Sequence, residues 1–176
     1  MPNALPSTAI FPPTQRQIHC DIFCAVVDNF GDAGVCWRLA QQLAVEYGWQ
    51  VRLWIDQPAL LDLLAPNYQA GKVKVCPWPT DFSSQNLATP DVVIEAFACT
   101  LPNAYLSAMA QRERQRNHPP VWLNLEYLSA ENWVGDMHGL PSPHPRLPLV
   151  KHFFFPGFDE KSGGLLHEAD YDARRL

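Results

Sequence analysis

The sequence predicts an α/β protein built on a Rossmann-like parallel sheet with helices on both faces. Short apolar runs typical of buried strands alternate along the chain with segments of helical spacing. Parallel strands need such crossover connections, which are right-handed in nearly all proteins. The chain has 176 residues, 47% of them apolar, which is enough for one globular unit with a substantial core.

The first unit is a strand, a tight bend and a helix. Four apolar residues predict a strand buried on both faces: Ile22, Phe23, Val26 and Val27. Helical spacing follows, so we expect a helix that begins near Asp32 or Ala33 and ends before Gly48. Gly31 and Gly34 permit tight curvature, and the free N–H groups at a helix start favour an anion such as a diphosphate.

Further strands and helices follow in alternation. Apolar runs predict strands over residues 51–55, 73–76, 91–97 and 121–125. Helices are expected over 58–64, opened by Pro58, and over 102–116. Residues 139–148 hold too many prolines for regular structure and predict a stiff loop or extended arm. Residues 153–155 predict a strand near the sheet edge, and residues 163–166 the lead-in to another element.

Composition divides the chain into two parts. Residues 1–17 carry prolines among Ser, Thr and Gln and predict a disordered tail, whereas residues 18–176 are expected to form the Rossmann-like domain. The formal net charge of −5 gives the chain no overall basic character, so nucleic acid is not an expected partner, although local basic patches stay possible. No apolar run reaches the roughly 20 residues that span a membrane. The five cysteines lie in apolar patterns, which indicates reduced core thiols and a cytoplasmic protein.

Asp28 and Asp32 are the first candidates for a functional site. Both follow the opening strand at its carboxyl end, where open parallel sheets bind their ligands. The alternative is structural, with Asp32 as a helix cap and Asp28 as a turn residue. Gly31 and Gly34 do not have the Gly-x-Gly-x-x-Gly spacing of dinucleotide sites, which counts against a nicotinamide-dependent oxidoreductase.

The remaining polar candidates favour structural roles. Asp56 ends the second strand, where a turn residue is commoner than a ribose ligand. Glu95 and Glu126 lie late in strands or just past them, and we expect each to pair with a neighbouring arginine rather than to face a ligand. Three histidines lack metal-ligand spacing, so no metal site is predicted: His138, His144 and His152.

Five blocks of sequence together match one family in the right order. They read FCAVVDNFGD (23–32), PDVVIEAFAC (90–99), VWLNLEYLSAE (121–131), HGLPSPHP (138–145) and FFFPGF (153–158). Through these blocks the chain resembles, from residue 22 to 166, the bacterial protein-arginine rhamnosyltransferases that modify elongation factor P. A generic glycine turn does not produce a match of this extent.

The resemblance implies the N-terminal domain of a GT-B fold, in which two Rossmann-like halves face each other across a cleft. Members of the family transfer rhamnose from dTDP-β-L-rhamnose to an arginine side chain of elongation factor P, with inversion and without a cofactor. Asp32 matches the general base of these enzymes, and Asp28 matches a second acid near the acceptor. Their donor-contacting turn matches Asn29, Phe30, Gly31 and Asp32.

Members of that family continue into a C-terminal donor-binding domain that this sequence lacks. We therefore expect a partial enzyme that binds the donor weakly and turns over poorly. Two other functions stay open at this point. One is a non-catalytic module that docks elongation factor P, and the other is the nucleotide-binding oxidoreductase that the glycine spacing disfavours.

Overall fold

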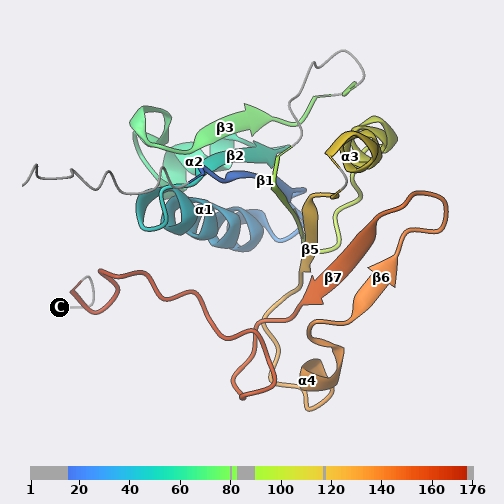
Figure 1. Cartoon of the computed structure of the whole chain (residues 1–176). Coiled ribbons are helices and arrows are strands. Elements are labelled where there is room, and N and C mark those ends of the chain that lie inside the picture. Colours follow the sequence, from blue (N-terminus) through green and yellow to red (C-terminus); the bar gives the residue numbers. More distant parts are fainter. Residues whose placement is uncertain (1–15, 80, 83–89, 117, 174–176) are drawn as a thin grey trace, which may run out of the picture.

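The computed structural model describes residues 16–79, 81–82, 90–116 and 118–173, and most of the predicted tail lies outside these ranges. Its centre is one sheet of seven strands in the order β3-β2-β1-β4-β5-β7-β6 (Figure 1). The strands are β1 (His19–Cys24), β2 (Gln50–Ile55), β3 (Lys74–Pro77), β4 (Val92–Ala96), β5 (Val121–Leu125), β6 (Pro141–Pro143) and β7 (Val150–Phe154). All neighbours pair in parallel except β6 and β7, so the predicted Rossmann-like fold is confirmed.

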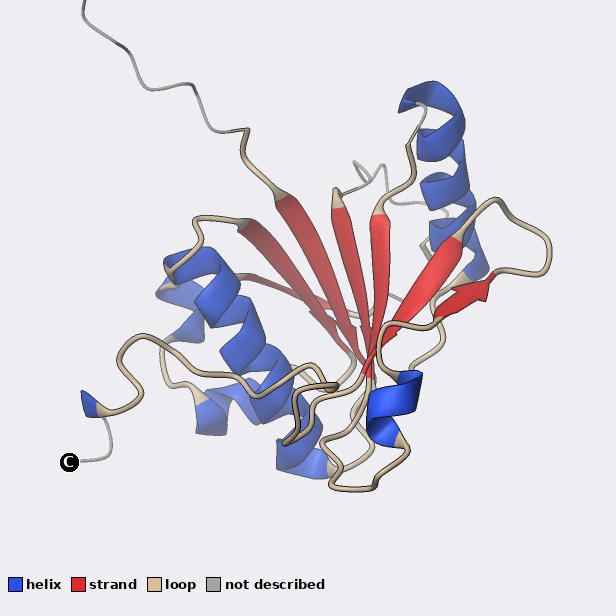
Figure 2. Cartoon of the chain, turned by 60° about the horizontal axis from the view of Figure 1, so that its bottom comes forward, coloured by secondary structure: helices blue, strands red, loops and turns tan. Residues whose placement is uncertain are grey.

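Helices cover both faces of this sheet (Figure 2). The helices α1 (Asn29–Val45) and α2 (Ala59–Leu64) lie on one face, and α3 (Asn103–Arg116) lies on the other. Two short helices, η1 (Tyr68–Ala70) and α4 (Val134–Met137), occur in the connections. This arrangement of a parallel sheet between helices is consistent with the N-terminal domain of a GT-B enzyme.

Alternate residues of β1 build two separate cores. Ile22 and Cys24 point into the cluster that packs against α1, whereas Phe23 points into the cluster beneath α3. The Phe23 ring lies 4.7 Å from the Tyr105 ring and 6.0 Å from the Trp54 ring, measured between centroids. A strand buried on both faces has this alternation, because each successive side chain leaves the opposite side of the sheet. All five cysteines are free and buried, as the sequence predicts.

The register aligns the carboxyl ends of neighbouring strands. Cys24, the last residue of β1, pairs with Ile55 of β2 and with Ala96 of β4. The chain runs from β1 outward through β2 to β3 on one side and resumes with β4 on the other. The bend that follows β1 therefore lies at the point where the strand order reverses, which is where open α/β sheets bind ligands.

The first strand and helix differ from the prediction at their junction. The strand ends at Cys24, so Val26 and Val27 lie in the bend, and α1 begins at Asn29 rather than near Asp32 or Ala33. The reason is local hydrogen bonding: the N–H of Val26 donates to Asp56, and the N–H of Val27 donates to Asp32. These amides bind carboxylates instead of extending the strand ladder. Val27 is consequently 79% exposed.

The proline-rich segment also differs from the prediction, because it contains a strand. Ser142 of β6 pairs antiparallel with Lys151 of β7, between two prolines that pair with Val150 and His152. Proline has no backbone N–H to donate to a neighbouring strand, so within sheets it is found on edge strands, whose outer side pairs with no further strand. As β6 is the last strand of the described sheet, its prolines meet this condition. The strand expected at 153–155 exists as β7, one place from the edge, but it begins earlier, at Val150, and ends at Phe154.

After β7 the chain returns across α1 (Figure 1). Glu168 accepts two hydrogen bonds from the Arg38 guanidinium, at 2.7 and 2.8 Å, and the carbonyl of His167 accepts one from Gln42 at 2.8 Å. The predicted lead-in at 163–166 thus continues into an irregular segment fastened to the helix rather than into a regular element. No helix in the described part of the chain is long and apolar enough to cross a membrane.

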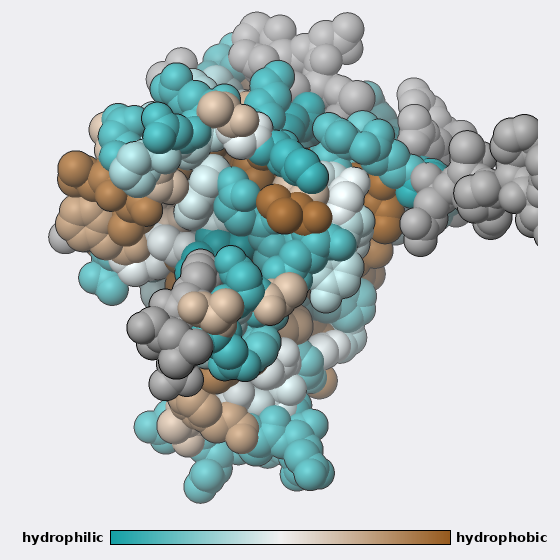
Figure 3. Space-filling model, turned by 90° about the vertical axis from the view of Figure 1, so that its left-hand side faces the viewer, coloured by the Kyte–Doolittle hydropathy of each residue, from teal (hydrophilic) through white to brown (hydrophobic). Residues whose placement is uncertain are grey.

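The surface facing the reader in Figure 3 is largely hydrophilic, with separate hydrophobic patches. This view shows the left-hand side of Figure 1. The exposed apolar residues include Val27 and Phe30 in and after the bend, and Tyr127 just after β5. Single exposed apolar side chains are normal on proteins, but these three belong to the loops at the carboxyl edge of the sheet.

Phe23 is buried and Val27 is exposed, so replacing each of them by Ala should change the free energy of unfolding by different amounts. Replacing Phe23, which is fully buried, by Ala is expected to lower the free energy of unfolding by about 3–5 kcal/mol, because a large cavity remains. Replacing exposed Val27 by Ala is expected to change it by less than about 0.5 kcal/mol. Urea unfolding of both variants measures the contrast, and a Val27→Ala cost similar to that of Phe23→Ala would contradict the position of the strand end.

Candidate active site at the carboxyl edge

The predicted acidic pair lies at the junction of β1 and α1, with the two carboxylates in different environments. Asp28 precedes the helix and is exposed, whereas Asp32 lies in the first helical turn and is 1% exposed. Asp28 occupies the N-cap position but makes no side-chain cap hydrogen bond. The carboxylate of Asp28 therefore does not accept a hydrogen bond from the backbone N–H groups at the start of α1.

Asp32 holds the bend by accepting hydrogen bonds from residues that precede the helix. Its Oδ2 accepts the N–H groups of Val27 and Asp28, both at 2.9 Å. A helix cap accepts N–H groups of the helix that follows it. Asp32 instead lies within the first turn of α1 and accepts N–H groups of residues that precede the helix. A negative charge in the first turn is also stabilised by the positive end of the helix dipole.

Gly31 brings the helix backbone close to the Asp28 carboxylate. A Cβ atom at Gly31 would lie 3.0 Å from Oδ2 of Asp28, whereas one at Gly34 would meet nothing within 4 Å. The N–H of Gly31 donates to the carbonyl of Asp28 at 2.9 Å. Phe30 beside it is 48% exposed. The predicted donor-contacting turn thus forms the first turn of α1, and Gly31 is the glycine at which an added Cβ would displace the Asp28 carboxylate.

Tyr127, to which the sequence analysis gave no role, joins this site from the loop after β5. Its phenol lies near the Asp32 carboxylate and interacts with it electrostatically, although Tyr127 is 46% exposed. Partial burial, followed by the interaction with the negatively charged Asp32 carboxylate, raises the pKa of the Tyr127 phenol. Tyr127 is therefore a partly exposed side chain that lies next to the buried Asp32 carboxylate.

Phe97 supports Tyr127 from the loop after β4. The two rings stack with centroids 4.4 Å apart and planes 20° from parallel. Phe97 and Ala98 have φ angles of 56° and 54°, so two successive non-glycine residues adopt the left-handed conformation. Such backbone costs of the order of 1–3 kcal/mol per residue and occurs preferentially at functional sites. No pattern in the sequence signals this conformation, because neither residue is Gly, Asn or Asp.

Asn124 and Glu126 form a second polar pair at the end of β5. The Asn124 amide donates to Oε1 of Glu126, so Glu126 pairs with an amide and not with the predicted arginine. Asn124 is 1% exposed, and its Oδ1 has no hydrogen-bond partner among the described residues. A buried unpaired acceptor is costly in a native protein, and strain, a catalytic role or a bound water or ion can account for one.

Glu95 and Asp56 have structural roles, as the sequence analysis favoured. Oε2 of Glu95 accepts hydrogen bonds from Trp122 and from Lys151, both at 3.1 Å, so its cation is a lysine rather than an arginine. Burial raises the pKa of Glu95, and Lys151 partly opposes this shift. Asp56 accepts the Val26 N–H at 3.0 Å and thereby fixes the start of the bend.

Two of the three histidines considered in the sequence analysis, His138 and His144, act as local hydrogen-bond acceptors. Nδ1 of His138 accepts the N–H of Phe155, and Nδ1 of His144 accepts the N–H groups of Arg146 and Leu147. Across the residues that the structure describes, no three His, Cys, Asp or Glu side chains are grouped so that they could hold a metal ion.

Taken together, the loops after β1, β4 and β5 converge on one acidic site. It offers an exposed carboxylate, a buried carboxylate held in a fixed orientation, and aromatic side chains beside them. Such a site suits a cationic group that has to be oriented, and the adjoining helix start suits an anion. The fold and this site define a Rossmann-like α/β domain with a candidate active site at the carboxyl edge of its sheet, consistent with one half of a GT-B glycosyltransferase.

Comparison with known proteins identifies the family. Residues 20–176 match the family described as "Elongation-Factor P (EF-P) rhamnosyltransferase EarP", so the chain belongs to it. It is 54% identical to the protein-arginine rhamnosyltransferase of Pseudomonas putida over 163 residues, and 51% identical to that of Pseudomonas aeruginosa over 162 residues. Each alignment covers 88% of this chain and 41% of the relative.

A third relative gives the same result. The protein-arginine rhamnosyltransferase of Neisseria meningitidis serogroup B is 47% identical over 158 residues, which cover 86% of this chain and 39% of the relative. The chain therefore spans about two fifths of the length of these relatives.

The two glycines of the bend provide a matched test of the packing around Asp28. Gly34→Ala is expected to raise the free energy of unfolding by up to about 1 kcal/mol, because alanine favours the helix and meets no neighbour. Gly31→Ala is expected to gain less and to move the Asp28 carboxylate. Urea unfolding and the carboxyl ¹³C shift of Asp28 measure both effects; equal gains without a shift of Asp28 would contradict the close approach.

The contact between Tyr127 and Asp32 predicts a titration effect. Asp32→Asn is expected to lower the pKa of the Tyr127 phenol, because the negative charge that disfavours its ionisation is removed. NMR titration with ¹³C-labelled tyrosine measures this pKa. Asp56→Asn is the control, since Asp56 binds the Val26 N–H and should leave Tyr127 unchanged. An identical Tyr127 pKa with Asp and Asn at position 32 would rule the contact out.

Proposed function

We propose that this chain is the acceptor-side half of an enzyme that transfers rhamnose from dTDP-β-L-rhamnose to an arginine side chain of elongation factor P. The transfer proceeds with inversion at the sugar carbon. Membership of the EarP family over residues 20–176 supports the proposal. The observation that carries it at the level of the site is the pair Asp28 and Asp32, one exposed and one buried, at the carboxyl edge of the sheet.

The acceptor group explains the need for two carboxylates. A guanidinium stays protonated up to a pH above about 12 and is a poor nucleophile, so it must be oriented and must lose a proton as the new bond forms. In our proposal Asp28 binds the guanidinium from the surface, where its carboxylate is exposed and makes no cap. Charge-assisted hydrogen bonds of this kind are strong and directional.

Asp32 serves as the general base in this proposal. Its Oδ2 already accepts two backbone N–H groups, so Oδ1 is the oxygen with more capacity to receive a proton. The arginine nitrogen attacks the sugar carbon as the bond between that carbon and the diphosphate oxygen breaks. The proton leaves the nitrogen for Asp32, and the electron pair of the broken bond leaves with the diphosphate. The exposed Tyr127 lies beside this carboxylate.

The start of α1 faces the donor in this arrangement. Asn29, Phe30 and Gly31 form the first turn of a helix of 17 residues, whose N–H groups and dipole favour the developing negative charge of a leaving diphosphate. Exposed Phe30 offers an apolar surface beside it. Backbone donors aimed at a leaving group stabilise it without a cofactor.

A module that only docks elongation factor P is the second candidate. The two N–H bonds to Asp32 favour it, because they account for the burial of this carboxylate without any chemistry. The two candidate functions, docking alone and rhamnose transfer, make different demands on the carboxylate of Asp32. Docking requires only the shape and charge of the surface, whereas transfer requires a group that accepts a proton.

The decisive experiment replaces Asp32 by Asn in a protein that joins this chain to the C-terminal part present in its full-length relatives. Asp32→Asn preserves a carbonyl oxygen for the N–H groups of Val27 and Asp28 but removes the base. We expect the rate of transfer to fall by about 10²–10⁴, with elongation factor P still bound. Mass spectrometry of elongation factor P measures the transfer. Unchanged transfer would return Asp32 to a structural role.

Asp56→Asn and Asp28→Asn complete this series. Asp56 also binds a backbone N–H of the bend, so its variant controls for loss of local structure and should retain most of the activity. Asp28→Asn is expected to weaken acceptor binding, because the exposed charge is lost. We further propose that the isolated chain transfers little rhamnose, and a rate comparable with that of a full-length relative would contradict this.

A further inference from the structure

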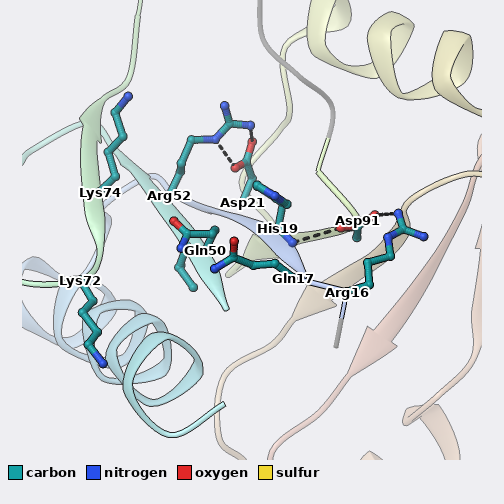
Figure 4. A pocket seen from close by; sticks show the side chains of 10 residues that line it. Arg16, Gln17, His19, Asp21, Gln50, Arg52, Lys72, Lys74 and Asp91 are labelled. Atoms are coloured by element: carbon teal, nitrogen blue, oxygen red, sulfur yellow. Dashed lines mark hydrogen bonds and ion pairs between the residues drawn. The ribbon is translucent and has the colours of Figure 1, made fainter. Parts of the chain in front are cut away.

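A cavity of about 420 Å³ lies at the opposite end of the sheet from the acidic bend. Its walls come from the amino ends of β1, β2 and β3, and from residues that precede β1 and β4 (Figure 4). The bend and its carboxylates follow the carboxyl end of β1 and do not line this cavity. The two sites therefore use different edges of the same sheet.

Cationic side chains outnumber carboxylates in the cavity, although the whole chain has a formal net charge of −5. Four cationic residues line it, Arg16, Arg52, Lys72 and Lys74, together with His19. The two carboxylates are Asp21 and Asp91. Positive potential is thus concentrated at this edge of an otherwise acidic chain.

Both carboxylates are occupied by contacts within the protein. Asp21, 1% exposed, accepts two hydrogen bonds from Arg52 at 2.6 and 2.7 Å and one from the Tyr105 hydroxyl at 2.6 Å. Asp91 accepts hydrogen bonds from Arg16, from Arg112 and from the N–H of His19. Neither carboxylate is therefore positioned to neutralise the two lysines.

Lys72 and Lys74 have no ion pair within the described part of the chain, and the side-chain amides of Gln17 and Gln50 make no hydrogen bond there. In Figure 4 the two glutamines lie between the lysines and the pair formed by Arg16 and Asp91. The cavity thus combines two ammonium groups on long, adjustable side chains with amide donors nearer its centre. Ammonium groups bind phosphate as point charges, and amides add directed hydrogen bonds.

We infer that this cavity is a binding site for a small phosphorylated metabolite, separate from the acidic bend. The volume falls within the range of small-molecule sites, roughly 300–1,000 Å³. The named polar side chains recognise phosphate oxygens rather than an apolar group, and no Trp, Tyr or Phe lines the cavity to stack on a base. An extended nucleic acid would need a longer basic surface than this cavity provides.

Titration of the chain with inorganic pyrophosphate at low ionic strength tests the inference. We expect saturable shifts of the backbone amide NMR signals of Gln17, Gln50, Lys72 and Lys74. The double variant Lys72→Gln, Lys74→Gln is expected to weaken binding about tenfold or more, because two charged contacts are lost. These lysines are exposed, so the variant should keep its fold, which the remaining NMR signals verify. Lys161→Gln, at an exposed lysine that does not line the cavity, should bind as the unchanged chain does.

Three outcomes would overturn the inference. The first is the absence of saturable shifts, and the second is equal affinity of the double variant and the unchanged chain. The third is a set of shifts confined to residues 29–34, which would assign the bound pyrophosphate to the helix start. A short single-stranded RNA provides a further comparison: tighter binding of the RNA, with shifts that extend well beyond the cavity, would also exclude a site for a small metabolite.

Discussion

The hydrogen bonds from the Val27 and Asp28 N–H groups to Asp32 determine the geometry of the site. They hold the bend between β1 and α1, where one carboxylate is buried while its neighbour stays exposed. A carboxylate buried at the positive end of a helix with two amide donors is compensated for its lost hydration. The same two bonds therefore provide local stability and leave a fixed acid beside the surface.

The parallel register then decides what surrounds this acid. Because β1, β4 and β5 end at the same edge, residues 30 to 95 positions apart in the sequence meet there: Asp32, Phe97 and Tyr127. The left-handed backbone at Phe97 and Ala98 costs free energy that the stacked rings and the adjoining sheet have to offset. A rigid edge of this kind suits orientation of a substrate, and the amino edge carries the opposite charge character.

Apolar periodicity predicted most elements because burial dictates it. The strand at 121–125 and the helix opened by Pro58 occur where the pattern places them, since each has a plain apolar run or a fixed proline start. The pattern was wrong at Val26 and Val27, where two carboxylates capture the backbone amides of apolar residues. It was also wrong at Pro141–Pro143, because only the place of a strand within the sheet decides whether proline is tolerated.

By itself, the sequence determined the α/β class, the acidic bend and the family, because these depend on local spacing and on contiguous blocks of residues. The assignment of Asp28 and Asp32 to chemistry stays a prediction. Only the tertiary structure decided that Asp32 is buried and Asp28 exposed, that Tyr127 reaches Asp32, and that cationic residues gather at the far edge. These features depend on strand order and register, which bring distant residues together and which no local pattern encodes.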